Sequence, residues 1–285
     1  MSNTNNEISP IELERRSYRK KQVIKSTLIS IISLIVLVVV IIILLKTSAG
    51  WETVKKSFFN QEYFLSSLPV VFKGLLINIK ILCIVLVGVI ILAPTLAIIR
   101  TSKAPVLFPL RIFALVFTTI MRGTPILVLL YLIGFGVPGL HIFKSTQAIT
   151  LGSIALILAY SAFVSEVIRS GIESIHPSQI QAARSLGLSA RKTMALIILP
   201  QAIRKIIPAL MNDFISLQKD VGLVSVLGII DAVRSAQIEV AHSFNFTPYV
   251  VAAFLFILFS LPFIALSDWY NKKIQNREIN QGGEL

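Results

Sequence analysis

Residues 28–45 read LISIISLIVLVVVIIILL and contain no charged side chain. A helix needs about 20 predominantly apolar residues to cross the hydrocarbon core of a bilayer. This run is nearly that long, and at least five further segments approach the same length. The chain is 55% hydrophobic, whereas soluble domains are about 45–50% apolar. The apolar runs therefore predict an all-α integral membrane protein with about six transmembrane helices.

Working outward from this run, the expected spans are residues 26–45, 75–98, 108–135, 148–168, 206–228 and 247–267. The first is interpreted as an extra, uncleaved N-terminal anchor, because its apolar run exceeds the ~7–15 residues of a cleavable signal. The remaining expected parts are a basic cytoplasmic tail (1–25), an external or interfacial segment (46–74), a transmembrane domain (75–270) and a second cytoplasmic tail (271–285).

The aromatic and charged residues of 46–74 have two interpretations. Trp51, Phe58 and Tyr63 alternate with Lys and Glu, a mixture that suits an amphipathic helix lying at the outer surface. An aromatic belt that anchors the neighbouring spans explains the same residues equally well.

The net charge of +13 could indicate a nucleic-acid partner, but its distribution favours another cause. With both termini inside, the cytoplasmic segments hold 18 of the 27 Lys and Arg residues and the external segments hold six. An excess of Lys and Arg on the cytoplasmic side is the usual orientation signal of membrane proteins. We therefore expect a multi-pass protein of the cell membrane with both termini in the cytoplasm and no nucleic-acid partner.

Several chemistries are not supported by the sequence. Cys83 is the one cysteine, and His141, His176 and His242 are scattered, so neither a disulfide within the chain nor a metal cluster is expected. Residues 134–139 match G-x-G-x-x-G, but they follow a membrane helix and lack the strand–helix context of a dinucleotide site. They are interpreted as a turn-rich external loop. With no P-loop and no nucleophile–base set, the chain is expected to bind no cofactor and to catalyse no reaction itself.

Polar residues within the spans mark candidate functional positions, because ionisable groups at bilayer depth are costly and usually face an interior or a path. The break Arg122-Gly123-Thr124-Pro125 should interrupt the third span. Residues that are hypothesised to border a solute path are Tyr160, Glu166, Asn212 and Lys219.

Each of these polar residues also has a structural interpretation. Asp213 and Asp220 could pair with Lys80 or Arg122 to hold the bundle together, and this role is favoured for Asp220, Lys219 and Arg122. Glu166, together with Arg169 and Glu173, could form a surface ladder of ion pairs instead of a gate.

The segment 171–205 is polar and is expected to form a cytoplasmic helix–Gly–helix hairpin. Ser178 and Gln181 have the spacing of a capping box, which predicts a helix over about 179–186. Gly187 suits the left-handed position that ends such a helix. Ser189 can cap a second helix, which Pro200 should end or bend.

The first hairpin helix carries a small apolar face. Ala182, Ala183 and Leu186 are three and four residues apart and are expected on one side, while Arg184 keeps the hairpin basic. Such a helix could dock in a groove of a partner protein. It could equally cap the bundle, and the residues alone leave both interpretations open.

The pattern E-A-A-x-x-x-G followed after nine residues by I-x-L-P resembles the cytoplasmic signature of permeases of ATP-binding-cassette (ABC) importers. The matching residues are Ala182, Ala183, Gly187, Ile197, Leu199 and Pro200, with Gln181 in place of Glu. Further similarity to the polar amino-acid branch covers about residues 65–275 and includes Arg122-Gly-Thr-Pro125, Glu166-x-x-Arg169-x-Gly171 and Lys219-Asp220. Val221-Gly222 departs from the small hydroxylated residues of that branch.

The resemblance implies a permease that forms the path for a polar amino acid or a similar small zwitterion. Its implied partners are a cytoplasmic P-loop ATPase pair that holds ATP and Mg²⁺, an external solute-binding protein and a second permease copy or homologue. The resemblance also implies that the hairpin helix, about residues 179–188, sits in a cleft of the ATPase. The alternatives are a stand-alone channel or secondary carrier, which leaves the hairpin unexplained, and a membrane enzyme or scaffold.

Overall fold

A computed structural model describes residues 10–102, 104–141 and 147–282, and these residues form helices joined by short turns, without a strand. Six helices in the described part are long and apolar enough to cross a membrane. The predicted all-α membrane fold is thereby confirmed. The chain divides into two compact units, Met1–Ser57 and Phe58–Leu285.

The first unit consists of a long helix and most of a short one. Helix α1 (Pro10–Thr47) is continuous over 38 residues, so the described part of the basic tail belongs to the same helix as the apolar anchor. Every α1 side chain whose exposure is described is exposed. Helix α2 (Trp51–Phe58) follows within the segment expected to be interfacial.

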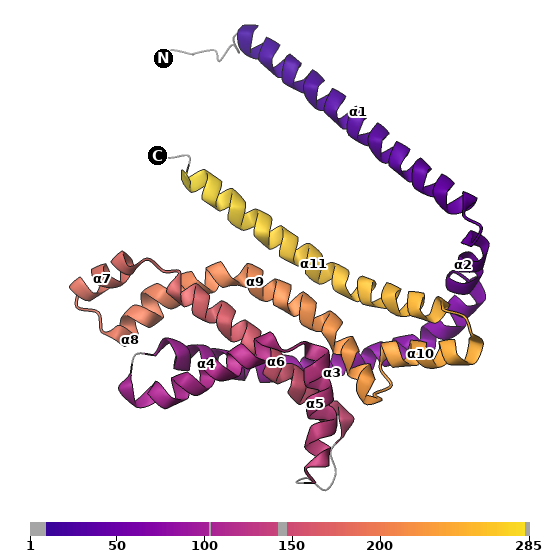
Figure 1. Ribbon diagram of the computed structural model, residues 1–285. Helices are drawn as coiled ribbons and strands as arrows, with labels where there is room; N and C mark the ends of the chain where they lie inside the picture. Colours follow the sequence, from indigo (N-terminus) through magenta and orange to yellow (C-terminus); the bar gives the residue numbers. More distant parts are fainter. Residues whose placement is uncertain (1–9, 103, 142–146, 283–285) are drawn as a thin grey trace. The chain divides into compact units, whose positions relative to one another are not determined.

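The second unit is a helical bundle (Figure 1). Its elements are α3 (Gln61–Thr101), η1 (Pro105–Leu107), α4 (Phe108–Gly123), α5 (Ile126–Gly139), α6 (Ala148–Glu173), α7 (Pro177–Ser185), α8 (Ala190–Thr193), η2 (Met194–Ile198), α9 (Leu199–Asp220), η3 (Val221–Leu227), α10 (Ala232–Ser243) and α11 (Thr247–Gly282). Helices α3 and α6 are central: α3 packs against α6, α10 and α11, and α6 also packs against α4, α5 and α9.

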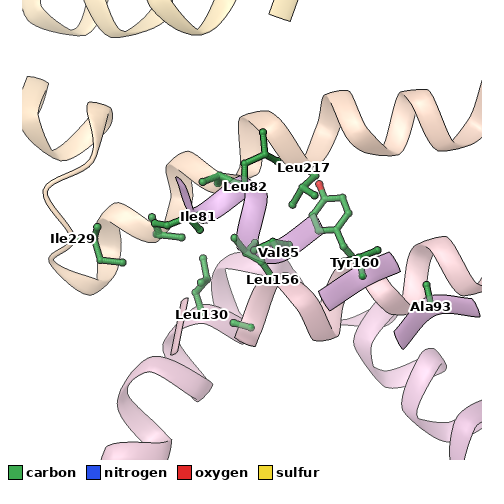
Figure 2. Packing of buried hydrophobic residues seen from close by; sticks show 13 residues of the cluster. Ile81, Leu82, Val85, Ala93, Leu130, Leu156, Tyr160, Leu217 and Ile229 are labelled. Carbon is green, nitrogen blue, oxygen red and sulfur yellow. The ribbon is translucent and has the colours of Figure 1, made fainter. Parts of the chain in front are cut away.

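The larger hydrophobic core lies where α3, α5, α6 and α9 meet. Figure 2 shows Ile81 and Val85 of α3 together with Leu130 of α5, Leu156 of α6 and Leu217 of α9. Each of these five side chains is at most 4% exposed. A second cluster joins α3 to α10 and α11. The apolar side chains therefore fix α6 and α9 against α3.

A polar joint fixes the beginning of α10 against α3. Gly74 approaches so closely that a Cβ there would lie 2.5 Å from the backbone carbonyl of Asp231. One turn further, the Asn78 Nδ2 group donates to Asp231 Oδ2 (2.9 Å), and the Ala232 N–H donates to Asn78 Oδ1 (3.0 Å). Asn78 and Asp231 are buried. Because these buried polar groups have hydrogen-bond partners, the start of α10 is held at one fixed position along α3.

The helix that contains the second expected span is longer than the span, and one predicted loop is wrong. Helix α3 begins at Gln61, because the Asn60 side chain accepts the N–H groups of Glu62 and Tyr63 and so caps it. The loop expected at residues 134–139 is the C-terminal part of α5. Gly134 lies there against Leu227, where a Cβ would overlap the Leu227 side chain. That glycine allows close helix packing and does not mark a turn.

The connection between the fifth and sixth expected spans, residues 229–246, contains helix α10, which is capped by the Asp231 side chain at the Arg234 N–H. The break in the third span is confirmed, since α4 ends at Gly123 and α5 begins at Ile126 after Pro125.

Candidate coupling hairpin and membrane-embedded polar groups

The first hairpin helix, α7, begins at Pro177, two residues before the predicted start at residue 179. Pro177 occupies its first turn, where a missing N–H costs nothing. His176 Nδ1 accepts the Ser178 N–H (3.2 Å) and lies 2.7 Å from Ser178 Oγ. The predicted cap by Ser178 with Gln181 is therefore wrong: His176 caps the helix, and Ser178 lies inside it.

The end of α7 has the predicted geometry. Gly187 has a φ of +77°, in the left-handed region that glycine adopts without steric cost. The Leu188 N–H donates to the Ala183 carbonyl (3.1 Å), and the Gly187 N–H donates to the Arg184 carbonyl (2.9 Å). This pair of bonds is a Schellman motif, which satisfies the last carbonyls of a helix. No atom lies within 4 Å of a Cβ built on Gly187.

The two alanines of α7 face different surroundings. Ala183 is 4% exposed and packs within the protein, while Ala182 is exposed and Leu186 is 82% exposed. The expectation that Ala182, Ala183 and Leu186 form one accessible face therefore needs correction. A partner that approaches this end of the hairpin meets Leu186 and Ala182, with Arg184 and Gln181 exposed beside them.

The second hairpin helix continues into the fifth span through an irregular turn. Ser189 caps α8 at the Lys192 N–H, as predicted. The segment η2 is a π-type turn, at whose end the Leu199 N–H donates to the carbonyl of Met194. Pro200 has no N–H to offer an α-helical partner. It therefore lies in the first turn of α9 and does not end the helix.

Side-chain hydrogen bonds join the hairpin helix α7 to α9, and α9 to the end of α6. Gln201 of α9 donates from Nε2 to Gln179 Oε1 of α7 (2.7 Å). Lys205 of α9 donates from Nζ to the carbonyl of Ser174, just after α6 (3.2 Å). The hairpin helix α7 is therefore linked directly to α9, and α9 is linked to the end of α6.

A cluster of charged residues surrounds Glu166 on α6. Glu166 Oε2 accepts from Arg100 of α3 (2.6 Å), and Oε1 accepts from Arg169 (2.5 Å). Arg122 of α4 lies 3.6 Å from Oε2, and Arg169 also pairs with Glu173. The predicted ladder of Glu166, Arg169 and Glu173 is present, but Glu166 also links α3 and α4 to α6. Arg122 lies beside Glu166, and neither Asp213 nor Asp220 forms an ion pair with it.

The remaining candidate path residues lie in two places. Tyr160 of α6 donates to Asp220 Oδ2 (2.6 Å), which ties α6 to the end of α9. Tyr160 also lines a cavity of about 260 Å³ with Asp213, whose buried Oδ2 lacks a hydrogen-bond partner among the described residues. Asn212 and Lys219 lie on the exposed face of α9 with Ser216. The four hypothesised path residues are therefore not brought together within one chain.

Three buried polar residues were missed in the sequence analysis. Asn78 and Asp231 form the joint between α3 and α10, and Gln218 donates from Nε2 to Ser260 Oγ of α11 (2.7 Å). A polar residue inside an apolar span is the signal that could have identified Asn78 and Gln218. Asp231, three residues before Arg234, has the position of a helix cap.

The chain is a multi-pass helical membrane protein in which a polar hairpin connects the spanning helices α6 and α9. This arrangement is expected of a transport subunit. The family described as "Binding-protein-dependent transport system inner membrane component" matches residues 104–276. The chain belongs to this family and is therefore a transmembrane permease subunit of an ABC importer, a multi-pass protein of the inner membrane.

Individual relatives agree with this assignment. A Rickettsia typhi protein is 37% identical over 68% of this chain and 89% of its own length. Its name provisionally assigns it to a glutamine transport system as the permease GlnP. The arginine transport system permease ArtQ of Bacillus subtilis is 31% identical over 74% of this chain and 95% of its own length. A crystal structure of an amino acid ABC transporter with histidines superposes with a TM-score of 0.67 at 32% identity, covering 73% and 96% of the two chains.

Proposed function

We propose that this permease subunit forms part of the translocation path for a polar amino acid or a similar small zwitterion. The names of the relatives, which mention glutamine, arginine and histidine, support this solute class. A zwitterion needs both cationic and anionic partners, and the polar groups on α6 and α9 include both. ATP and Mg²⁺ are held by a separate ATPase, so this chain binds no cofactor of its own.

The hairpin, residues 178–200, receives the motion of a cytoplasmic P-loop ATPase pair. The observation that carries this proposal is the hydrogen bond from Gln201 of α9 to Gln179 of the hairpin, together with the bond from Lys205 that joins α9 to the end of α6. The exposed Leu186 offers an apolar anchor for a groove of the ATPase, with Arg184 beside it. ATP binding then moves α6 and α9 as rigid bodies, which is the usual mechanism of alternating access.

Two further partners complete the importer. An external solute-binding protein delivers the solute, and a second permease, either a copy of this chain or a homologue, faces the first. The exposed polar residues Asn212, Ser216 and Lys219 on α9 support this arrangement, because polar side chains within a span usually face a bundle interior or a path. The N- and C-termini lie in the cytoplasm, on the same side as the hairpin.

The test of this assembly is a pull-down of the chain from its native membrane in mild detergent, with partners identified by mass. Recovery of a P-loop ATPase is expected, and the ligand of a co-purified binding protein would name the solute. Recovery of the chain alone after cross-linking would favour a stand-alone channel or carrier.

A second test concerns the path itself. In the assembled importer, Glu166→Gln should change the solute concentration dependence of uptake if Glu166 borders the path. Unchanged uptake at every solute concentration would remove Glu166 from the path and leave it with its structural role among the arginines.

A further inference from the structure

A polar pocket of about 450 Å³ lies among α5, η3, α10 and α11, beyond the end of α9 that is opposite to the hairpin. Its polar lining residues are Tyr131, Ser225, Arg234, Gln237 and Tyr249, with Gly228 at the turn after η3. None of them belongs to the hairpin or to the groups proposed to border the path. The volume falls within the range of small-molecule sites, about 300–1,000 Å³.

The lining is rich in hydrogen-bond donors and contains no carboxylate. Arg234 donates from one guanidinium nitrogen to Gln237 Oε1 (2.6 Å), and no described carboxylate lies within ion-pair distance of it. Arginine has five N–H donors in a planar fork that matches a carboxylate. Tyr131, Ser225 and Tyr249 bring three hydroxyl groups to the same lining.

The place of Arg234 in the chain also favours an anionic ligand. Arg234 lies in the first turn of α10, whose N-terminus is already capped by Asp231, so the positive charge offered to the pocket is that of the guanidinium. In the proposed orientation the pocket opens on the external side, where Lys and Arg are usually scarce. Arg234 is the one Lys or Arg of residues 229–246, so the ordinary orientation signal does not account for it.

We infer that this pocket is a binding site for the α-carboxylate of the amino-acid solute, with Arg234 as its main ligand. The inference rests on the proposed function for the solute class and for the orientation of the pocket. Arg234 and Gln237 hold the carboxylate in bidentate fashion, and the hydroxyl groups of Tyr131, Ser225 and Tyr249 supply further donors. The site receives the solute at the external end, before the path that α6 and α9 border.

The test uses a cysteine reporter in the complete importer, reconstituted in proteoliposomes. Ser225→Cys is introduced together with Cys83→Ala, because Cys83 is exposed. The labelling rates of an anionic and a cationic methanethiosulfonate are compared, with and without L-glutamine and L-arginine. The anionic reagent should react about tenfold faster, since a positive pocket concentrates anions. Either amino acid should slow labelling, whereas its α-amide, which lacks the carboxylate, should not.

Arg234→Gln should remove both the preference for the anionic reagent and the protection. Lys272→Gln makes the same change of charge at an exposed position on α11 and should alter neither. Val226→Cys is a second reporter from the same lining, for use if the Ser225 variant does not fold. Labelling rates that are unaffected by Arg234→Gln, or protection by the α-amide, would overturn the inference.

Amino-acid uptake by the same proteoliposomes separates this inference from the proposed function. Uptake without protection at the reporter means that the pocket is not a carboxylate site, while the importer still carries amino acids. Absence of amino-acid uptake by the unmodified importer means instead that the proposed solute class is wrong.

Discussion

At the scale of single residues, Glu166 is the shared counter-charge of a cluster of arginines at one end of the bundle. It lies among three arginines from α3, α4 and α6, and its side chain is 20% exposed, against 10% for Arg100. A nearly buried guanidinium without a counter-charge is costly. The glutamate therefore stabilises the packing of three helices, whatever part it also has in transport.

The first prediction concerns this pair. Glu166→Gln should lower the free energy of unfolding by about 2 kcal/mol, less than for a fully buried pair because water still reaches the site. Arg100→Gln alone should also destabilise, and the double variant should lose less than the sum of the two changes. Thermal unfolding of the four proteins in nanodiscs measures this coupling. Strictly additive losses would show that the two side chains do not interact.

A second prediction follows from Asp231, outside the spanning segments. Burial raises the pKa of its carboxyl above the ordinary value, although hydrogen bonds from the Arg234 N–H and from Asn78 act in the opposite direction. In the folded chain the carboxyl therefore keeps its proton to higher pH than in the unfolded chain, where its pKa is about 4. As pH rises from the pKa of the unfolded chain through the raised pKa of the folded chain, the contribution of Asp231 to the free energy of unfolding consequently falls.

Denaturation of the wild type and of Asp231→Asn across this pH window measures that contribution. The variant has no carboxyl to titrate and should show a flatter dependence on pH. Asp268→Asn, at an exposed position on α11, is the control and should keep the wild-type slope. Identical slopes for the wild type and Asp231→Asn would contradict the prediction.

At the scale of elements, the hairpin depends on one backbone conformation. The Schellman motif needs Gly187 at positive φ, while the space around its Cβ is open. A substitution there acts through the backbone and not through a clash. The left-handed conformation costs a residue with a side chain about 1–2 kcal/mol.

Gly187→Val should therefore disturb the end of α7 and weaken binding of the ATPase, while the bundle remains folded. Gly187→Asn should retain most of the binding, because asparagine tolerates this conformation. Gly136→Val is a matched control, since a Cβ at Gly136 also meets no atom within 4 Å and its φ is not positive. Co-purification of the ATPase and the rate of coupled ATP hydrolysis are the measurements. Normal coupling in the valine variant would exclude this role of the hairpin.

The elements also show what could be predicted from sequence and what could not. The apolar runs, the break after Gly123 and the turn at Gly187 were predicted correctly because each depends on local composition or local backbone preference. The joint between α3 and α10 could not be found in this way, since Asp231 and its partner Asn78 are 153 residues apart. Residues 134–139 were wrongly predicted to form a loop, because glycine occurs in closely packed helices as well as in turns. Among the candidate site residues, His176 replaced the predicted cap because Pro177 moves the helix start.

At the scale of the whole molecule, the two units differ in how they bury apolar surface. Both hydrophobic clusters draw their buried residues from position 71 onwards, and α1 contributes none of them. The bundle therefore has a complete core without residues 1–57. The family match, which begins at residue 104, lies entirely within the second unit.

We expect a chain that starts at Phe58 to form the same bundle. Its free energy of unfolding in detergent should stay within about 0.5 kcal/mol of that of the full chain, as for changes away from a core. Loss of cooperative unfolding in the shortened chain would show that the first unit is required for folding.

The polar stripe on α9 has a consequence for the synthesis of the protein. A subunit inserted without its partners leaves Lys219 and Asn212 uncovered within a span, and a lysine at bilayer depth costs about 2.5–3.5 kcal/mol on insertion scales. Solitary subunits should therefore be recognised by membrane proteases, and their lifetime in a pulse-chase experiment should lengthen when the other components are co-expressed. The supply of partners would in this way set the number of permease subunits in the membrane, without a separate regulator.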